Sequence, residues 1–138
     1  ESLVDIGENA FKSCSMLSGS LAIPSKLEKI PSDCFYDCDF TGDLIIPEGV
    51  KIIAGRAFSK NRFTSLVLPN SLTSLGGGAF SFNSGMQGDL VIPPQIISIA
   101  GETFRETAFT SIVIPEGVLE IGKNAFSGNV PGFIMINS

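Results

Sequence analysis

Residues 43–58 read DLIIPEGVKIIAGRAF, and the chain repeats this pattern along its whole length. It returns as SLVLPNSLTSLGGGAF at residues 65–80 and as SIVIPEGVLEIGKNAF at residues 111–126. A phenylalanine closes each repeat, in steps of 24, 23, 22, 24 and 22 residues: Phe11, Phe35, Phe58, Phe80, Phe104 and Phe126. A unit this short buries an apolar face only against its neighbours, so the repeats predict a stacked solenoid of about six coils.

Each repeat predicts two short strands and a turn. The segment 44–47 alternates apolar positions with a period of two, and Pro47 ends the strand because proline has no amide hydrogen for a ladder. A second apolar pair, Val50 and Ile53, predicts another short strand, after which a turn or a single helical turn carries the chain through Phe58. Repeats that stack in sequence order must pair in parallel, and we expect a right-handed coil.

The connectors that lead into the first strand of each repeat have two lengths. The longer ones contain a glycine, which is Gly19, Gly42 or Gly88, whereas the shorter ones read Phe-Thr-Ser at residues 63–65 and 109–111. Glycine tolerates backbone conformations that other residues avoid, so these three positions predict a bulge just before the strand.

The composition argues against several classes of function. With 138 residues, 43% of them hydrophobic, the chain is large and apolar enough for a packed core. Its net charge of −5 would repel a phosphate backbone, which argues against nucleic acid as a partner. The chain contains no histidine, which excludes a Ser-His-Asp triad and mixed Cys/His zinc sites. Neither an apolar run of about 20 residues nor a signal-peptide pattern stands in this sequence.

The three cysteines are expected to be structural. Cys14 and Cys38 lie three residues after a phenylalanine, in a column that continues as Asn61, Asn83, Thr107 and Asn129. Small residues that can donate a hydrogen bond predict a buried ladder that satisfies backbone carbonyls at a tight turn. A disulfide between Cys14 and Cys38 is the alternative, but stacked side chains point the same way and oppose its geometry. Cys34 lies in the alanine column and is expected to be a small core residue. We expect no metal and no cofactor.

An acidic run near the second repeat does not fit a calcium loop. Its members are Asp33, Asp37, Asp39 and Asp43. Their spacing departs from the alternating aspartates of calcium-binding loops, so we expect a solvated acidic corner instead.

One outward-facing column is apolar in every repeat. It lies between the two inward residues of each predicted first strand, and we name it the apolar stripe: Ala22, Ile45, Val67, Val91, Val113 and Met135. Asp43 and Asp89 flank it on a polar rim of aspartate and serine. Valine and isoleucine suit any sheet face, so the stripe is either ordinary strand surface or a binding site.

The quoted strings resemble the BspA-like leucine-rich repeat family, known from treponemal and other bacterial surface proteins. The shared motif, I/L-x-I-P-x-x-V/L-x-x-I-G-x-x-A-F, covers essentially the whole chain. The departures from it are Pro31, Ala54 and Ala100 at the glycine position and Asn137 at the last proline. The resemblance implies a curved leucine-rich repeat solenoid, secreted or displayed on a bacterial cell surface, that binds other macromolecules in adhesion and is not an enzyme.

We therefore expect residues 1–138 to form a single leucine-rich repeat solenoid that acts as a non-enzymatic recognition module. The chain begins and ends inside a repeat, so we expect it to be part of a longer repeat protein. The apolar stripe, with Asp43 and Asp89 on its rim, would bind a protein, a glycoprotein or a glycan, such as a host or matrix component, or a second copy of the chain. The alternative is a structural spacer that displays another domain, and no nucleophile–base pair favours an enzyme.

Overall fold

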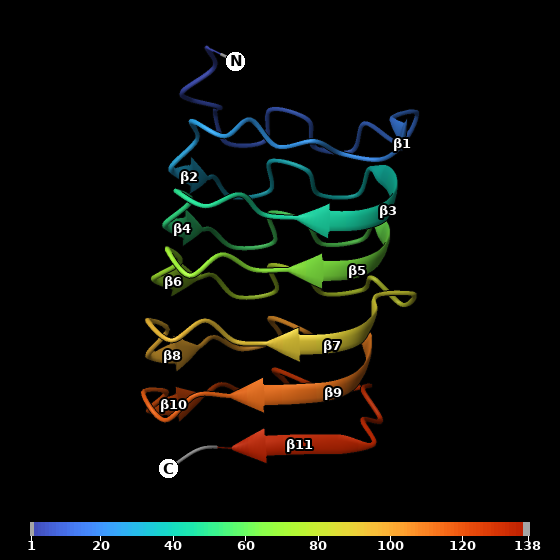
Figure 1. Ribbon diagram of the computed structural model, residues 1–138. Helices are drawn as coiled ribbons and strands as arrows, with labels where there is room; N and C mark the ends of the chain where they lie inside the picture. The colour runs from blue at the N-terminus through green and yellow to red at the C-terminus, as the bar shows by residue number, and fades with distance from the viewer. Residues whose placement is uncertain (1, 137–138) are drawn as a thin grey trace.

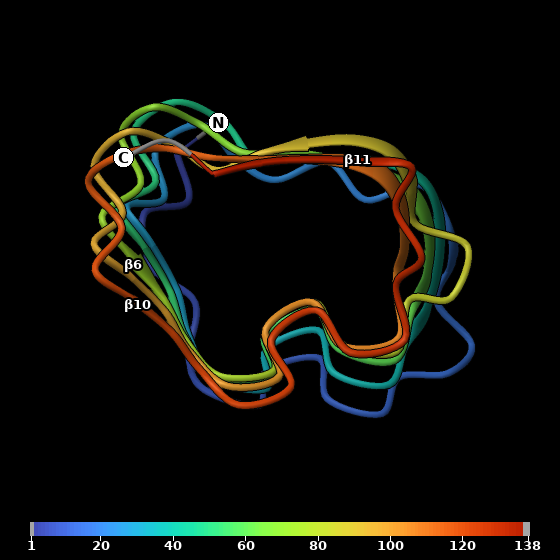
Figure 2. The ribbon, with the colours of Figure 1, turned by 90° about the horizontal axis from the view of Figure 1, so that it is seen from below.

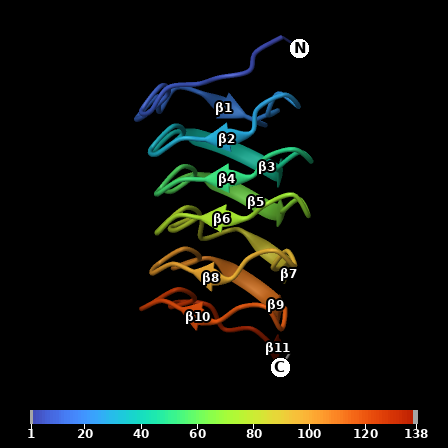
Figure 3. The same ribbon diagram turned by 90° about the vertical axis from the view of Figure 1, so that its left-hand side faces the viewer.

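The computed structural model describes residues 2–136 and is a stack of similar coils, each with two strand sides and one turn side (Figure 1). The first strands of the coils are β1 (Ser18–Gly19), β3 (Asp39–Ile45), β5 (Arg62–Val67), β7 (Gln87–Val91), β9 (Ala108–Ile114) and β11 (Phe133–Ile136). The second strands are β2 (Lys29–Ile30), β4 (Ile52–Ile53), β6 (Ser74–Leu75), β8 (Ser98–Ile99) and β10 (Glu120–Ile121), stacked as Figure 3 shows. The described residues contain no helix, so the connection through each phenylalanine is a turn and not a helical turn.

All of the strand pairs are parallel, as the repeats predict. The first strands form the sheets β1-β3-β5 and β7-β9-β11, and the second strands form β2-β4-β6 and β8-β10. The predicted strand at residues 21–23 is wrong, because β1 ends at Gly19. Ser18 pairs with Asp39, whereas the repeat aligns Leu21 with Leu44. To pair Leu21 with Leu44, the register between the two strands would have to shift by two residues after Gly19. The pairing ends at Gly19 instead. The departure expected at Asn137 lies outside the described residues.

The predicted bulges lie at two of the three glycines, with the extra residue on the opposite strand. The pairing shifts between Gly42 and Asp43 and again between Gly88 and Asp89. Gly42 pairs with Phe63 and Asp43 with Ser65, so Thr64 of the shorter connector is the residue left without a partner. Gly42 has a φ of 80°, which accounts for a glycine here.

A column of stacked phenylalanines forms the centre of the core. Phe58, Phe80 and Phe104 are fully buried, and neighbouring rings of the column lie nearly parallel with centroids 5.3 to 5.6 Å apart. Phe63 and Phe109 pack edge-on against Phe58 and Phe104. Stacking on the neighbouring coils therefore buries the middle of the column, whereas Phe11 at its N-terminal end is 40% exposed.

Each column phenylalanine lies between two residues with left-handed backbone, two positions before it and two after. Around Phe58 these residues are Arg56 and Lys60, with φ of 54° and 58°. The paired reversals indent each turn toward the interior, on the side of the coil opposite β11 (Figure 2). Backbone bonds join one turn to the next, as from the Phe58 amide to the Ala79 carbonyl over 2.8 Å. The same side of the stack carries a groove, whose lining includes Asp33, Arg56 and Lys60.

Both strand sides are interrupted at the middle of the stack, while the turn side is not. Neither β5 with β7 nor β6 with β8 forms a bonded pair, and Figure 1 shows the wider separation there. On the turn side the Phe80 amide still donates to the Thr103 carbonyl over 2.9 Å. The step from Phe80 to Leu90 is two residues longer than that from Phe58 to Leu66, so the connector into β7 is the longer of the two. The loop leading into β7 protrudes in Figure 2.

Candidate functional site

The structure places most of the apolar stripe on the open surface of the first strands. Ile45, Val67 and Val91 are 59%, 54% and 59% exposed. Ala22 and Met135 are also exposed, whereas Val113 is half-buried. These side chains alternate with buried core residues such as Leu44 and Leu66, as expected for a strand with one face packed inward.

Coils stacked in register would join the stripe into one continuous ridge, but its strand residues form two blocks, and Ala22 lies outside the strands. Ile45 lies directly opposite Val67 in the first block. Val91 lies opposite Val113 and Val113 opposite Met135 in the second. A hollow of about 140 Å³ separates the blocks, lined by Leu66, Val67, Leu68, Asp89 and Val91. The expectation of a continuous ridge is corrected at this point, because β5 and β7 are not paired.

Each block has one aspartate on its rim, held by a serine of the neighbouring strand. The Ser65 hydroxyl donates to Asp43 Oδ1 over 2.7 Å, and the Ser111 hydroxyl donates to Asp89 Oδ1 over 2.7 Å. Both aspartates are exposed. The hydrogen bond fixes the direction of each carboxylate beside the apolar side chains, so the two blocks present the same acidic feature to a partner.

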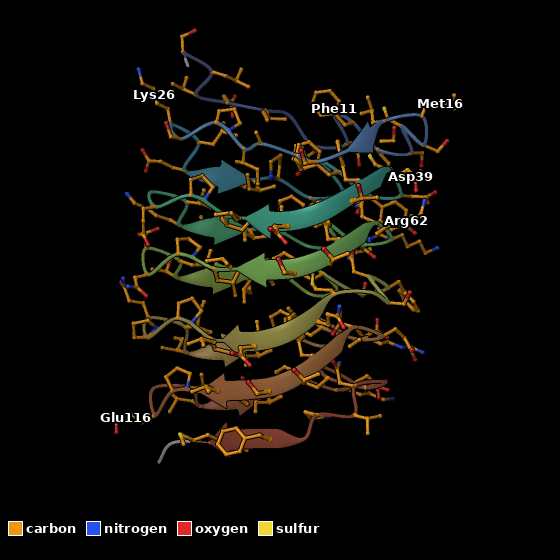
Figure 4. All side chains as sticks on the ribbon, turned by 45° about the vertical axis from the view of Figure 1, so that its right-hand side comes forward. Phe11, Met16, Lys26, Asp39, Arg62 and Glu116 are labelled. Atoms are coloured by element: carbon orange, nitrogen blue, oxygen red, sulfur yellow. The ribbon has the colours of Figure 1, made fainter. Side chains whose placement is uncertain are left out.

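An ion pair lies where β3 and β5 begin. Arg62 Nη1 lies 3.4 Å from Asp39 Oδ1, and Figure 4 shows the two labelled side chains next to each other. Both side chains are partly open to water, so the pair contributes little to stability. Asp39 is thus paired with Arg62, whereas Asp43 beside the stripe is bonded to the Ser65 hydroxyl.

Cys34 and Cys38 are buried, as the sequence predicts, whereas Cys14 is only half-buried. All three are free thiols, and Cys38 donates a hydrogen bond to the Phe11 carbonyl over 3.0 Å. Burial, and then the neighbouring Cys38, raises the pKa of the Cys34 thiol to about 11. Burial also raises the pKa of Cys38. A raised pKa keeps a thiol protonated at neutral pH, which makes both residues poor nucleophiles.

Asp33 differs from the solvated corner that the acidic run predicts. It is 7% exposed, and its Oδ2 accepts hydrogen bonds from Arg56 Nη2 at 2.9 Å and Lys12 Nζ at 3.4 Å. The correction has a physical cause, since stacking brings two cations from the adjacent turns to this carboxylate. Within residues 2–136, no three cysteine and carboxylate side chains gather as a metal site would require.

The sequence reading missed a groove on the turn side. It has a volume of about 600 Å³ and includes Asp33, Tyr36, Arg56, Lys60 and Phe82 among its lining residues. One signal for the groove stands in the sequence, in the column one residue after each phenylalanine. There two small serines, Ser59 and Ser81, separate the larger Tyr36 and Arg105. The whole column is Lys12, Tyr36, Ser59, Ser81, Arg105 and Ser127.

Comparisons with known proteins agree with this architecture. The family model for the BspA type leucine rich repeat region matches residues 4–130 in six copies. A crystal structure of a leucine-rich repeat protein from Bacteroides ovatus is similar, with a TM-score of 0.55 and 22% sequence identity. The match covers 84% of this chain and 42% of that one. No curated protein matches the sequence.

These findings fix the class of the protein. Leucine-rich repeats of this kind are protein-interaction or recognition modules and are typically not enzymes, and the BspA type is generally found in bacterial surface or secreted proteins. None of the described residues lies in a helix able to cross a membrane. The chain belongs to the BspA-type leucine-rich repeat family.

Proposed function

We propose that the chain is an adhesive recognition module, displayed on or secreted from a bacterial cell, that binds a protein or glycoprotein through the apolar stripe. In this proposal residues 1–138 act as one solenoid domain without catalytic activity. The observation that carries it is the exposure of Ile45, Val67 and Val91 on the same side of the stacked coils. Exposed apolar side chains gathered on one surface are typical of interaction sites in soluble proteins.

The rim defines the kind of partner that would fit. Asp43 and Asp89 lie in equivalent places beside the two blocks, each oriented by a serine hydroxyl. A partner with basic residues around an apolar centre would match both charges, and its binding would weaken as salt screens them. A second copy of the chain offers the same acidic rim and would be repelled there, so a basic partner is favoured over self-association.

The competing function is a spacer that holds another domain at a distance. A spacer has no need of apolar side chains on its outer surface, so the two functions differ in their response to changes in the stripe. The hollow between Val67 and Val91 adds a concave feature that a spacer would not use.

A double substitution tests the proposal. Val67→Lys with Val91→Lys places two charges in the centre of the stripe without touching the core, because both side chains face solvent. The matched control is Ile97→Lys with Leu119→Lys, two exposed apolar residues outside the stripe. Binding is measured on an array of purified extracellular-matrix glycoproteins, with sedimentation velocity as the test of self-association.

We expect the stripe variant to lose the interactions of the parent chain and the control variant to keep them. If the stripe variant folds and binds as the parent does, the stripe is ordinary strand surface and the spacer function gains. If the parent chain binds nothing on the array and stays monomeric, the recognition proposal fails for these partners.

A further inference from the structure

The groove on the turn side is a short trough with large side chains at its two ends. Its floor includes Ser59 and Ser81, whose hydroxyl groups lie 2.8 Å apart, both buried. In the same column the preceding turn carries Tyr36 and the following turn carries Arg105. The small serines leave a hollow between these two large residues, and its volume of about 600 Å³ is in the range of small-molecule sites.

Positive charge gathers at the Tyr36 end of the trough. Lys12 Nζ, the Arg56 guanidinium carbon and Lys60 Nζ lie 5.6, 5.2 and 5.5 Å from the centre of the Tyr36 ring. Asp33 neutralises part of this charge through its contacts with Lys12 and Arg56. Lys60 has no carboxylate within ion-pair distance among the described residues. The cations therefore exceed the carboxylates that pair with them.

Neither Glu102 nor Asp37 removes this excess. Glu102 lines the far end of the trough, where it is paired with Arg105. Asp37 is exposed and forms no ion pair among residues 2–136. Lys60 is thus free to bind an anionic group of a ligand in the trough.

Asp33 sets a second requirement for a ligand, which is a hydrogen-bond donor. Its Oδ1 atom is buried and has no hydrogen-bond partner in the structure, whereas Oδ2 is bonded to Arg56 and Lys12. A buried carboxylate oxygen without a hydrogen-bond donor destabilises the folded state, because the atom has lost its hydrogen bonds to water and gained none. Because Asp33 lines the trough, a rotation of its carboxylate that exposes this oxygen would let a ligand hydroxyl supply the missing donor.

Two aromatic side chains line the same trough. Tyr36 stands at one end, and Phe82 is 42% exposed with the Arg105 guanidinium 5.4 Å from its ring centre. Aromatic rings offer an apolar surface to the C–H face of a sugar ring. The lining thus combines a cation for an acid group, an acceptor for a hydroxyl and apolar surface for a ring.

We propose that this trough binds an acidic sugar, either a hexuronic acid or a sialic acid, at a site separate from the apolar stripe. The sugar carboxylate lies at Arg56 and Lys60, and a ring hydroxyl donates to Asp33 Oδ1. An inorganic anion would match the cations but would supply no donor for Asp33. A neutral sugar would supply the donor but would leave Lys60 without a counter-charge. Only a ligand with both groups meets both requirements.

The test is a titration of the whole chain by calorimetry and by amide chemical shifts. The probes are N-acetylneuraminic acid and glucuronic acid, with glucose as the neutral control and sodium sulfate as the charge-only control. The variants are Lys60→Gln and Asp33→Asn, and Lys26→Gln is the matched control because Lys26 is an exposed lysine outside the trough. Circular dichroism checks the folding of each variant.

We expect at least one acidic sugar to bind saturably, with shifts at Tyr36, Ser59 and Ser81, and glucose and sulfate to bind at least tenfold more weakly. Lys60→Gln and Asp33→Asn each weaken binding about tenfold, and Lys26→Gln does not. Asp33 is buried, so if its variant unfolds, the exposed Lys60 still decides the outcome. Absence of saturable binding by both acidic sugars overturns the proposal. Equal binding of sulfate, or binding unchanged in Lys60→Gln, overturns it as well.

Discussion

The side-chain amide of Asn83 donates a hydrogen bond to the carbonyl oxygen of Phe58, 3.0 Å away in the preceding turn. The same amide donates to the Phe80 carbonyl of its own turn over 3.0 Å, and Asn83 Oδ1 accepts from the Phe63 amide at 3.4 Å. One fully buried side chain therefore joins two turns and a strand. Asn61 makes the equivalent contacts one coil earlier, with the Phe35 carbonyl at 2.7 Å.

Asn83→Ala should reduce the free energy of unfolding by about 2–4 kcal/mol. The change removes the donor of the Phe80 carbonyl and an acceptor of the Phe63 amide, whereas the Phe58 carbonyl keeps the Asn61 amide at 3.2 Å. Each unsatisfied buried group costs about 1–3 kcal/mol. Urea denaturation followed by circular dichroism gives the value. Ser84→Ala, at the exposed neighbouring residue, is the control and should stay within about 0.5 kcal/mol of the parent. An Asn83 variant as stable as this control would contradict the ladder.

Cys38→Asn should be tolerated better than Cys38→Leu. Cys38 stands in the column of Asn61 and Asn83 and donates to the Phe11 carbonyl, so an asparagine retains a donor whereas a leucine removes it. Thermal unfolding compares the two variants. Intact mass before and after reduction checks that Cys14 and Cys38 are not bonded to each other in the native protein. A gain of two hydrogens on reduction, mapped to this pair, would refute the stacked-thiol arrangement.

The stability of the protein should fall as the pH rises from about 8.5 to 11. Burial raises the pKa of Cys34 to about 11, above its value of about 8.5 in an unfolded chain. The folded state keeps a proton that the unfolded state has lost, so the stabilisation is complete below pH 8.5 and disappears through pH 11. Cys38 shifts in the same direction.

Cys34→Ala isolates this effect, because alanine fills the same column at Ala57 and Ala79. The two proteins differ only at residue 34, so the difference between the two curves reports Cys34. We expect the variant to lose less stability between pH 8.5 and 11, measured by urea denaturation at each pH. Parallel curves would show that Cys34 does not contribute.

Phe58→Ala should destabilise the protein by about 3–5 kcal/mol. Phe58 is fully buried between Phe35 and Phe80, with ring centroids 5.5 and 5.6 Å away, so its removal leaves a cavity in the middle of the column. Phe82→Ala is the matched control, since Phe82 is 42% exposed on the groove rim. Differential scanning calorimetry should show a large loss for the first variant and a small one for the second. Equal melting temperatures would contradict the repeat register.

Periodic features of the fold could be predicted from the sequence, and local departures could not. The phenylalanine column and the ladder at Asn61 and Asn83 recur at fixed steps, so their burial follows from stacking alone. The burial of Asp33 depends on Arg56 and Lys12 from the two adjacent turns, and no property of the acidic run itself shows that. The exposure of the stripe could be predicted from strand alternation, but its division into two blocks depends on pairing that only the structure reveals.

The interruption between β5 and β7 should be visible in amide exchange at Leu68. In the equivalent positions of two other coils, the Ile46 amide donates to the Val67 carbonyl and the Ile92 amide to the Val113 carbonyl, both over 3.0 Å. The corresponding bond from Leu68 to Val91 is not formed among the described residues. An amide without this hydrogen bond can exchange its hydrogen with solvent even while the neighbouring strand pairs stay intact.

We expect the Leu68 amide to exchange at least tenfold faster than those of Ile46 and Ile92, measured residue by residue by NMR in deuterated water. The Phe80 amide is the internal control, because the turn side of the same boundary is bonded to Thr103 and should stay protected. Strong protection at Leu68, equal to that at Ile46, would mean that the two sheets are joined in solution. Fast exchange at both Leu68 and Phe80 would instead show that the whole boundary opens, and that the turn-side ladder does not hold the two halves together.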